Sequence, residues 1–309
     1  TDADTRPRVF SIAAGTPFLA TLARALLRDA TLGGRLQSAT SFDLADVTIL
    51  LPTRRATREL AEAFLRESGG TALMLPTIRP LGDLDEEDLV LEQGPAEPGG
   101  AALLDLAPAI SPLERQLLLA RLIRQAWTDM DLARALALAD ELGRLLDQVA
   151  TEEASLEGLA SLVPESFAAN WQVTVDFLRI VTEHWPGVLA ERGQTDLGAR
   201  RIDLLKAQAE IWRTTPPQGP VIAAGSTGSI PASAELMRVI AEMPHGAVVL
   251  PGLDFHLDTE SFAALPPAHP QYGLAKLLTR LGLSRAEVEP WPDATPDEGG
   301  LEARRRMMS

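Results

Sequence analysis

The chain has 309 residues, of which 46% are hydrophobic and 23% charged, with a formal net charge of −15 and no cysteine. This composition is typical of a globular protein with one large or two ordinary domains, and it excludes disulfides, zinc–cysteine sites, iron–sulfur clusters and thiol catalysis within these residues. Residues 81–110 hold eight acidic and no basic side chains, so the acidity is concentrated and does not by itself exclude a nucleic-acid partner.

The first 80 residues alternate between strand-like and helix-like segments. Thr53 is suited to cap a helix, and the Gly69-Gly70 pair is suited to end it. Strands are expected at residues 8–13, 46–52 and 72–76, and helices at 18–27 and 54–67. This β-α-β-α-β order predicts an α/β fold with a parallel sheet covered by helices.

A long helical segment interrupts this pattern. Residues 81–110 are interpreted as an acidic loop, and a helix is expected to begin at Ser111, which forms a capping box with Glu114. Apolar residues then follow helical spacing to about residue 213. Residues 111–215 are therefore expected to form an all-helical inserted subdomain.

The strand–helix alternation returns after a proline-rich linker. Strands are expected at 221–224 and 246–251, with a helix at 232–242 between them. The simplest organisation is one discontinuous α/β domain, residues 1–80 plus 216–290, with residues 291–309 as a linker to further C-terminal parts. No apolar run is long enough to cross a membrane and no apolar signal core begins the sequence, so a cytoplasmic location is expected.

A nucleotide-binding loop is the first chemistry to test. The motif G-x-x-x-x-G-K-S/T needs a glycine directly before a lysine. The chain has two lysines, Lys206 and Lys276, and neither follows a glycine, so no intact loop of this kind exists. The turn Gly15-Thr16-Pro17 lies where such a loop would be, and Ala223-Ala224 ends a later strand where magnesium-binding carboxylates would be expected. The ATP site is thus predicted to be degenerate, with no cofactor and no catalytic residue in this chain.

The turn after residue 224 allows two interpretations. Its sequence resembles a hydrolase nucleophile elbow built on Ser226, with Asp254 and either His256 or His269 as partners. Its backbone N–H groups could instead bind an anion at a helix N-terminus; the residues are Gly225, Ser226, Thr227 and Gly228. The alternation of Asp254, His256 and Asp258 is interpreted as a polar loop, so no metal site is expected.

Arginines follow the second strand directly. Thr53, Arg54, Arg55 and Arg58 occupy the expected first turn of the following helix. Cations are unfavourable at a helix N-terminus unless an external anion binds there, and ligands bind beyond the carboxyl ends of strands in open α/β sheets. The cluster is either a solvated helix face or a contact site for nucleic-acid phosphates.

Several stretches resemble one known family. Residues 47–60, VTILLPTRRATREL, resemble a superfamily 1 helicase segment in which a threonine turn contacts single-stranded DNA. Four further stretches are similar to the AddB subunits of AddAB helicase-nucleases, in family order: residues 75–83, 109–121, 221–232 and 248–254.

This resemblance implies an inactivated helicase-like domain of superfamily 1 type that acts in double-strand-break repair by homologous recombination. It places Thr53, Arg54 and the adjacent Arg55 on a DNA-contacting turn. It also implies single-stranded DNA and an AddA-type helicase-nuclease subunit as partners, a role in Chi recognition, and a nuclease domain beyond these residues. The alternatives are a small-molecule hydrolase using Ser226 and an assembly scaffold without DNA contact.

Overall fold

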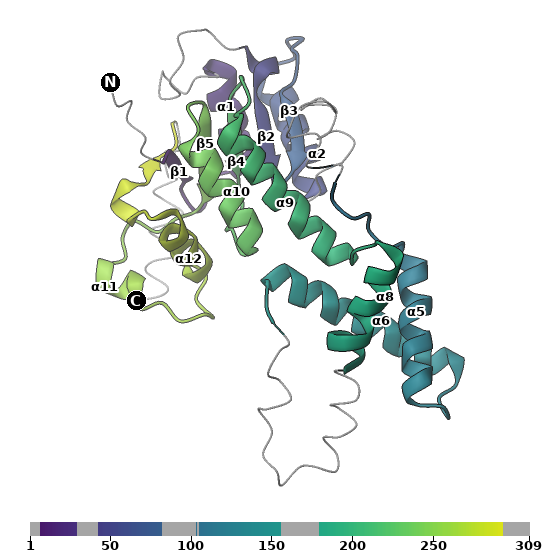
Figure 1. The fold of residues 1–309 in the computed structure, drawn as a ribbon. Coiled ribbons are helices and arrows are strands. Elements are labelled where there is room, and N and C mark those ends of the chain that lie inside the picture. Colours follow the sequence, from purple (N-terminus) through teal and green to yellow (C-terminus); the bar gives the residue numbers. More distant parts are fainter. Residues whose placement is uncertain (1–6, 30–42, 82–102, 104, 156–178, 293–309) are drawn as a thin grey trace. The chain divides into compact units, whose positions relative to one another are not determined.

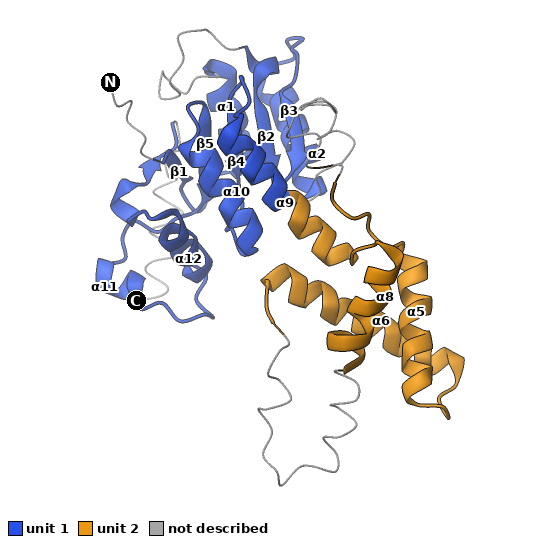
Figure 2. Ribbon diagram, in the orientation of Figure 1, with its two compact units in different colours: residues 1–85, 205–309 blue, residues 86–204 orange. Residues whose placement is uncertain are grey.

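The computed structural model describes residues 7–29, 43–81, 103, 105–155 and 179–292. The chain divides into two compact units, residues 1–85 with 205–309 and residues 86–204 (Figure 2). The second boundary lies inside helix α9 (Leu197–Thr214), earlier than the expected residue 216. Most of the expected acidic loop, and the tail 293–309, lie outside the described residues.

The first unit is built on a six-stranded sheet in which every pair of neighbouring strands is parallel, in the order β3-β2-β4-β5-β1-β6 (Figure 1). The strands are β1 (Val9–Ile12), β2 (Thr48–Leu51), β3 (Thr77–Pro80), β4 (Val221–Ala224), β5 (Gly246–Pro251) and β6 (Glu289–Pro290). The prediction of an α/β fold with a parallel sheet is confirmed. The central strands are nearly continuous apolar runs because both of their faces are covered.

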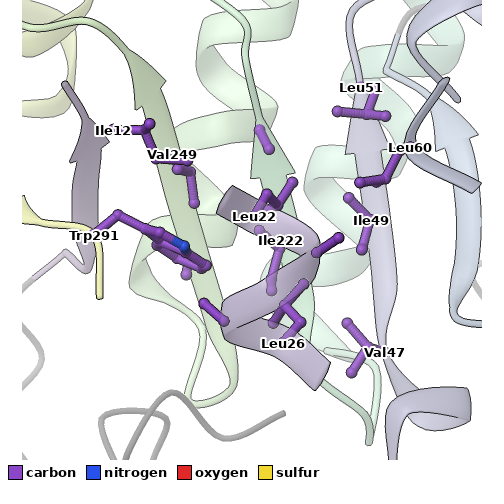
Figure 3. Close-up of a cluster of buried hydrophobic side chains, with 14 of the residues drawn as sticks. Ile12, Leu22, Leu26, Val47, Ile49, Leu51, Leu60, Ile222, Val249 and Trp291 are labelled. Atoms are coloured by element: carbon purple, nitrogen blue, oxygen red, sulfur yellow. The ribbon is translucent and has the colours of Figure 1, made fainter. Parts of the chain in front are cut away.

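Helices cover the two faces of the sheet in separate pairs. On one face, α1 (Phe18–Arg28) and α2 (Arg54–Glu67) pack against each other and onto alternate strand residues, including Ile49, Ile222 and Val249 (Figure 3). On the other face, α10 (Pro231–Glu242) packs on β4 and β5, and α12 (Tyr272–Leu281) packs against α10. A short helix, α11 (Thr259–Ala263), lies between β5 and α12 in the sequence.

The third strand differs from its prediction. Residues 72–76 form no strand, and Met74 is 78% exposed. The strand is instead Thr77–Pro80, which is held in register with β2 from Thr48↔Thr77 to Leu51↔Pro80. Apolar content was the wrong signal because β3 is an edge strand, where partial exposure and a proline are tolerated.

The domain also continues further than the sequence indicated. Trp291, which the sequence places in the linker, is buried in the core of the first unit. Its ring packs edge-on against Phe10, with ring centroids 5.5 Å apart, and its backbone N–H donates to the Ser11 carbonyl at 2.9 Å. The two-residue strand β6 and Trp291 therefore extend the sheet beyond β1.

The second unit is helical in its described residues. It contains α5 (Pro112–Ala126), α6 (Leu132–Glu152), a π-helical turn (Ile180–His184), α8 (Trp185–Arg192) and the start of α9. Ser111 caps α5 by accepting from the Glu114 N–H, as predicted.

A buried arginine connects the helices of this unit. The Arg115 guanidinium contacts Asp196 at 2.8 Å and Asp147 at 2.9 Å, and it donates to the Gly143 carbonyl. Asp196 also accepts from the Trp185 indole N–H at 2.7 Å. Buried charges need such partners, since an unpaired charge in a core is costly.

No helix in the described part of the chain combines the length and the apolar character needed to cross a lipid bilayer.

Arg8 connects the beginning of β1 to the turn between α10 and β5. Its guanidinium donates to the carbonyls of Pro244, at 2.7 Å, and Gly246, at 3.3 Å. His245 lies in the same turn. Burial, together with the nearby charge of Arg8, lowers the pKa of His245 below its ordinary value.

We expect Trp291→Ala to destabilise the first unit by about 3–5 kcal/mol, because it removes a large buried side chain from the core. Chemical denaturation followed by circular dichroism measures this decrease. Trp291→Phe, which keeps an aromatic ring beside Phe10, is the control and should be destabilised less. Equal stability of all three proteins would show that the fold ends before this residue.

We expect the stability of the fold to decrease as the pH falls through about 6.5, the ordinary pKa of histidine. Because the pKa of His245 is lowered in the folded state, the unfolded state binds more protons in this range, and the decrease levels off below the folded pKa. His245→Gln should reduce this pH dependence, measured as unfolding midpoints between pH 5 and 8. His256→Gln, at an exposed position, is the control for removal of one imidazole. If His245→Gln and the unaltered protein showed the same pH dependence of stability, His245 would not be the group responsible for it.

Candidate functional site

The predicted functional residues lie on one edge of the sheet. Because all strands are parallel, the turns that follow β1, β2, β4 and β5 share the carboxyl edge. The turns also touch one another. A Cβ built on Gly225 would lie 3.3 Å from the Phe18 ring and 3.7 Å from Pro52, and one on Gly252 would lie 3.2 Å from Ala14 Cβ. The structure therefore brings together segments that are far apart in the sequence.

At this edge, between β2 and β4, the connections that follow the strands lead in opposite directions along the sheet. β2 and β4 are neighbours, paired from Thr48↔Val221 to Leu50↔Ala223. The helix after β2 covers one face of the sheet and the helix after β4 covers the other. Neighbouring strands whose connections leave in opposite directions open a crevice at their carboxyl ends, and ligands of open α/β sheets bind there.

The arginine cluster lies on one side of this position. Thr53 Oγ1 accepts from the Ala56 N–H at 3.1 Å, so the predicted helix cap is confirmed. Thr53 and the three arginines, Arg54, Arg55 and Arg58, are all exposed, and the first turn of α2 holds no acidic residue.

Arg55 pairs with a carboxylate one turn further along α2. Its Nε donates to Glu59 at 2.8 Å, and this interaction raises the pKa of Arg55. The Arg55 side chain remains 88% exposed. Exposed ion pairs of this kind contribute little to stability, so an incoming phosphate can replace Glu59 at little cost.

The turn after β4 lies on the other side. Gly225 and Gly228 have φ values of +76° and +58°, which favour glycine. Ser226 Oγ accepts from the Gly228 N–H at 3.2 Å, and the Gly225 N–H donates to the Val249 carbonyl. Within the part of the chain that the structure describes, the backbone N–H groups of Ser226 and Thr227 have no acceptor. These two donors are the ones left to bind an anion.

The hydrolase arrangement gains no support from the hydrogen bonds. A catalytic histidine directs its Nδ1–H at a carboxylate. His269 Nδ1 instead accepts from the Gln271 N–H at 3.1 Å, and the Asp254 carboxylate accepts from the His256 backbone N–H at 2.7 Å. These groups stabilise the loop after β5. No hydrogen bond among the described residues joins Ser226 to a histidine.

The turn after β1 has an exposed glycine, Gly15, and a buried hydroxyl group, that of Thr16. Gly15 has φ +87°, and the Thr16 N–H donates to the Ala13 carbonyl at 3.2 Å. Pro17 precedes α1 without a side-chain cap, and Phe18 begins the helix with its ring against Gly225. An aromatic ring thus lies close to the position where a phosphate-binding lysine would begin the helix.

The described residues contain no group of three or more histidine, aspartate or glutamate side chains that could hold a metal ion. Ala223 and Ala224 are fully buried at the end of β4 and offer no side-chain oxygen.

Helix α12 supports the β4 turn, a role that was not predicted from the sequence. Arg280 Nη1 contacts the Gly228 carbonyl at 3.4 Å, and Gly273 lies against Thr227. A signal for the helix was present in the sequence, because Leu274, Leu277, Leu278 and Leu281 follow helical spacing.

No model of a protein family matches this chain, and comparison with curated proteins finds no relative.

We expect Gly228→Ala to be more destabilising than Gly282→Ala. Both positions have positive φ, which costs an alanine about 1–2 kcal/mol. A Cβ at Gly228 would also lie 2.6 Å from Leu277 Cδ1, whereas a Cβ at Gly282 meets nothing within 4 Å. Overpacking should add about 1–3 kcal/mol at Gly228. Urea denaturation of the two variants measures the difference, and equal destabilisation would contradict the packing of α12 on the turn.

Proposed function

We propose that this chain is a catalytically silent, helicase-like module of superfamily 1 type that guides single-stranded DNA, as the resemblance to AddB subunits implies. The observation that carries the proposal is the exposed cluster of Arg54, Arg55 and Arg58 at the N-terminus of α2, on the sheet edge where α/β proteins bind ligands. Without an anion, these cations oppose the positive end of the helix dipole. In the proposal, a DNA phosphate offsets this unfavourable interaction.

The proposed mechanism is positional. Arginine offers a planar fork of donors that matches phosphate oxygens. In the proposal, Arg54 and Arg55 contact consecutive phosphates, and the unsatisfied N–H groups of Ser226 and Thr227 offer a second anion-binding position on the same edge. Such interactions hold the strand without reading its bases.

Two features support a role without ATP hydrolysis. The sequence has no glycine–lysine pair, and Phe18 lies at the beginning of α1 with its ring against Gly225. The motor activity would then come from an AddA-type helicase-nuclease subunit. On this proposal the chain takes part in double-strand-break repair by homologous recombination, including Chi recognition, in the cytoplasm. It needs no cofactor of its own.

The test is binding of a single-stranded oligonucleotide at several salt concentrations. We expect Arg54→Ala with Arg55→Ala to weaken binding. The double change should also reduce the slope of log K against log salt by about 0.7 for each arginine–phosphate interaction that it removes. Fluorescence anisotropy with a labelled oligothymidylate measures both quantities.

The single variant Arg55→Ala is compared with a matched control, Arg66→Ala. Arg66 lies in the last turn of the same helix and pairs with Glu62 as Arg55 pairs with Glu59, so both changes remove an exposed, ion-paired arginine. Only the change at Arg55 should affect DNA binding. Equal binding by the wild-type and double-variant proteins, with unchanged salt slopes, would favour the assembly-scaffold alternative.

A further inference from the structure

A groove lies along α12 in the first unit, on residues that the proposed function does not use. Its volume is about 620 Å³. Its walls come from the loop after β5, from α11, from α12 and from the segment that follows α12.

Aromatic side chains contribute much of the apolar wall. Phe255, Phe262 and Tyr272 line the groove, and Tyr272 is the one tyrosine of the chain. Phe255 is 41% exposed, although a large apolar side chain would gain free energy from burial. A flat ligand that stacks on this ring would supply that burial.

Every charged residue that lines the groove is basic. The three are Lys276, Arg280 and Arg285, in a chain whose net charge is −15. Arg285 is held in place, because its Nη1 donates to the Asp254 carbonyl at 3.0 Å and its guanidinium lies 5.0 Å from the centre of the Phe262 ring. Lys276 is exposed and has no acidic partner among the described residues. The charge of the groove therefore complements an anion.

Helix α12 connects the groove to the turn after β4. Arg280 lines the groove and also contacts the Gly228 carbonyl, and Gly273, next to Tyr272, lies against Thr227. The groove and the turn after β4 thus both contact α12, so they lie at neighbouring positions of the first unit.

We propose that this groove holds a nucleotide of the same single-stranded DNA, with its base stacked on Phe255 and its phosphate near Lys276. This inference rests on the proposed function. Aromatic rings combined with cations are how proteins bind single strands without base specificity, since every base has a stacking face. An acidic peptide would satisfy the cations but would leave the exposed ring without a flat partner.

The first test compares Phe255→Ala and Lys276→Ala with the unaltered 309-residue chain, using oligothymidylates of increasing length. Removal of one stacking ring should weaken binding of the longer oligonucleotides by about 5-fold or more with no change in salt slope, because phenylalanine is uncharged. Lys276→Ala should lower the slope by about 0.7. Phe255→Trp and Lys276→Arg should retain binding. Both positions are exposed, and unfolding midpoints will verify that each variant is folded.

The second test is photocrosslinking with 5-iododeoxyuridine placed along the oligonucleotide. Crosslinks to peptides within residues 255–286 support the inference. Crosslinks confined to residues 53–58 and 225–229, with full binding by Phe255→Ala and Lys276→Ala, would overturn it and leave the proposed function standing. Binding of an acidic peptide in the groove with no effect of these variants on DNA would also overturn it. Absence of oligonucleotide binding by the unaltered chain would instead contradict the proposed function itself.

Discussion

The parallel pairing of β2 with β4 is the interaction on which the candidate site depends. The two strands are separated in the sequence by the whole helical unit, yet they lie in register from Thr48↔Val221 onward. Their common direction places the turn after each strand on the same edge. An antiparallel pairing would have separated Thr53 from Gly225 by the length of a strand.

That edge combines groups that do not stabilise the fold by themselves. Exposed arginines lie at the positive end of α2, and two N–H groups of the β4 turn have no acceptor within the described residues. Groups that depart from the usual local preferences of a fold are often found at functional sites. The same edge has buried alanines and a phenylalanine ring where nucleotide chemistry would need carboxylates and a lysine. These two observations are the basis of the proposal that the edge binds an anion.

The net charge of the chain does not describe the two surfaces that are proposed to bind DNA. The chain is strongly acidic, but eight of its acidic residues lie in the basic-free stretch 81–110. The two surfaces proposed to bind a polyanion, the first turn of α2 and the groove along α12, are locally basic. Electrostatic attraction at physiological salt acts over about 8 Å, so the local arrangement of charges matters more than the sum.

The strands and helices that flank the candidate site could largely be predicted from the amino-acid sequence. Apolar runs and caps indicated β4, β5 and the helix that begins after Thr53, because those elements depend on burial and on short-range hydrogen bonds. The order of the strands, the edge strand at Thr77–Pro80 in place of residues 72–76, and the burial of Trp291 emerged from the three-dimensional packing alone. So did the placement of the turn after β4 against Phe18, Pro52 and α12. Pairing between strands far apart in the chain follows from which faces pack together, and that choice leaves no periodic signal in the sequence.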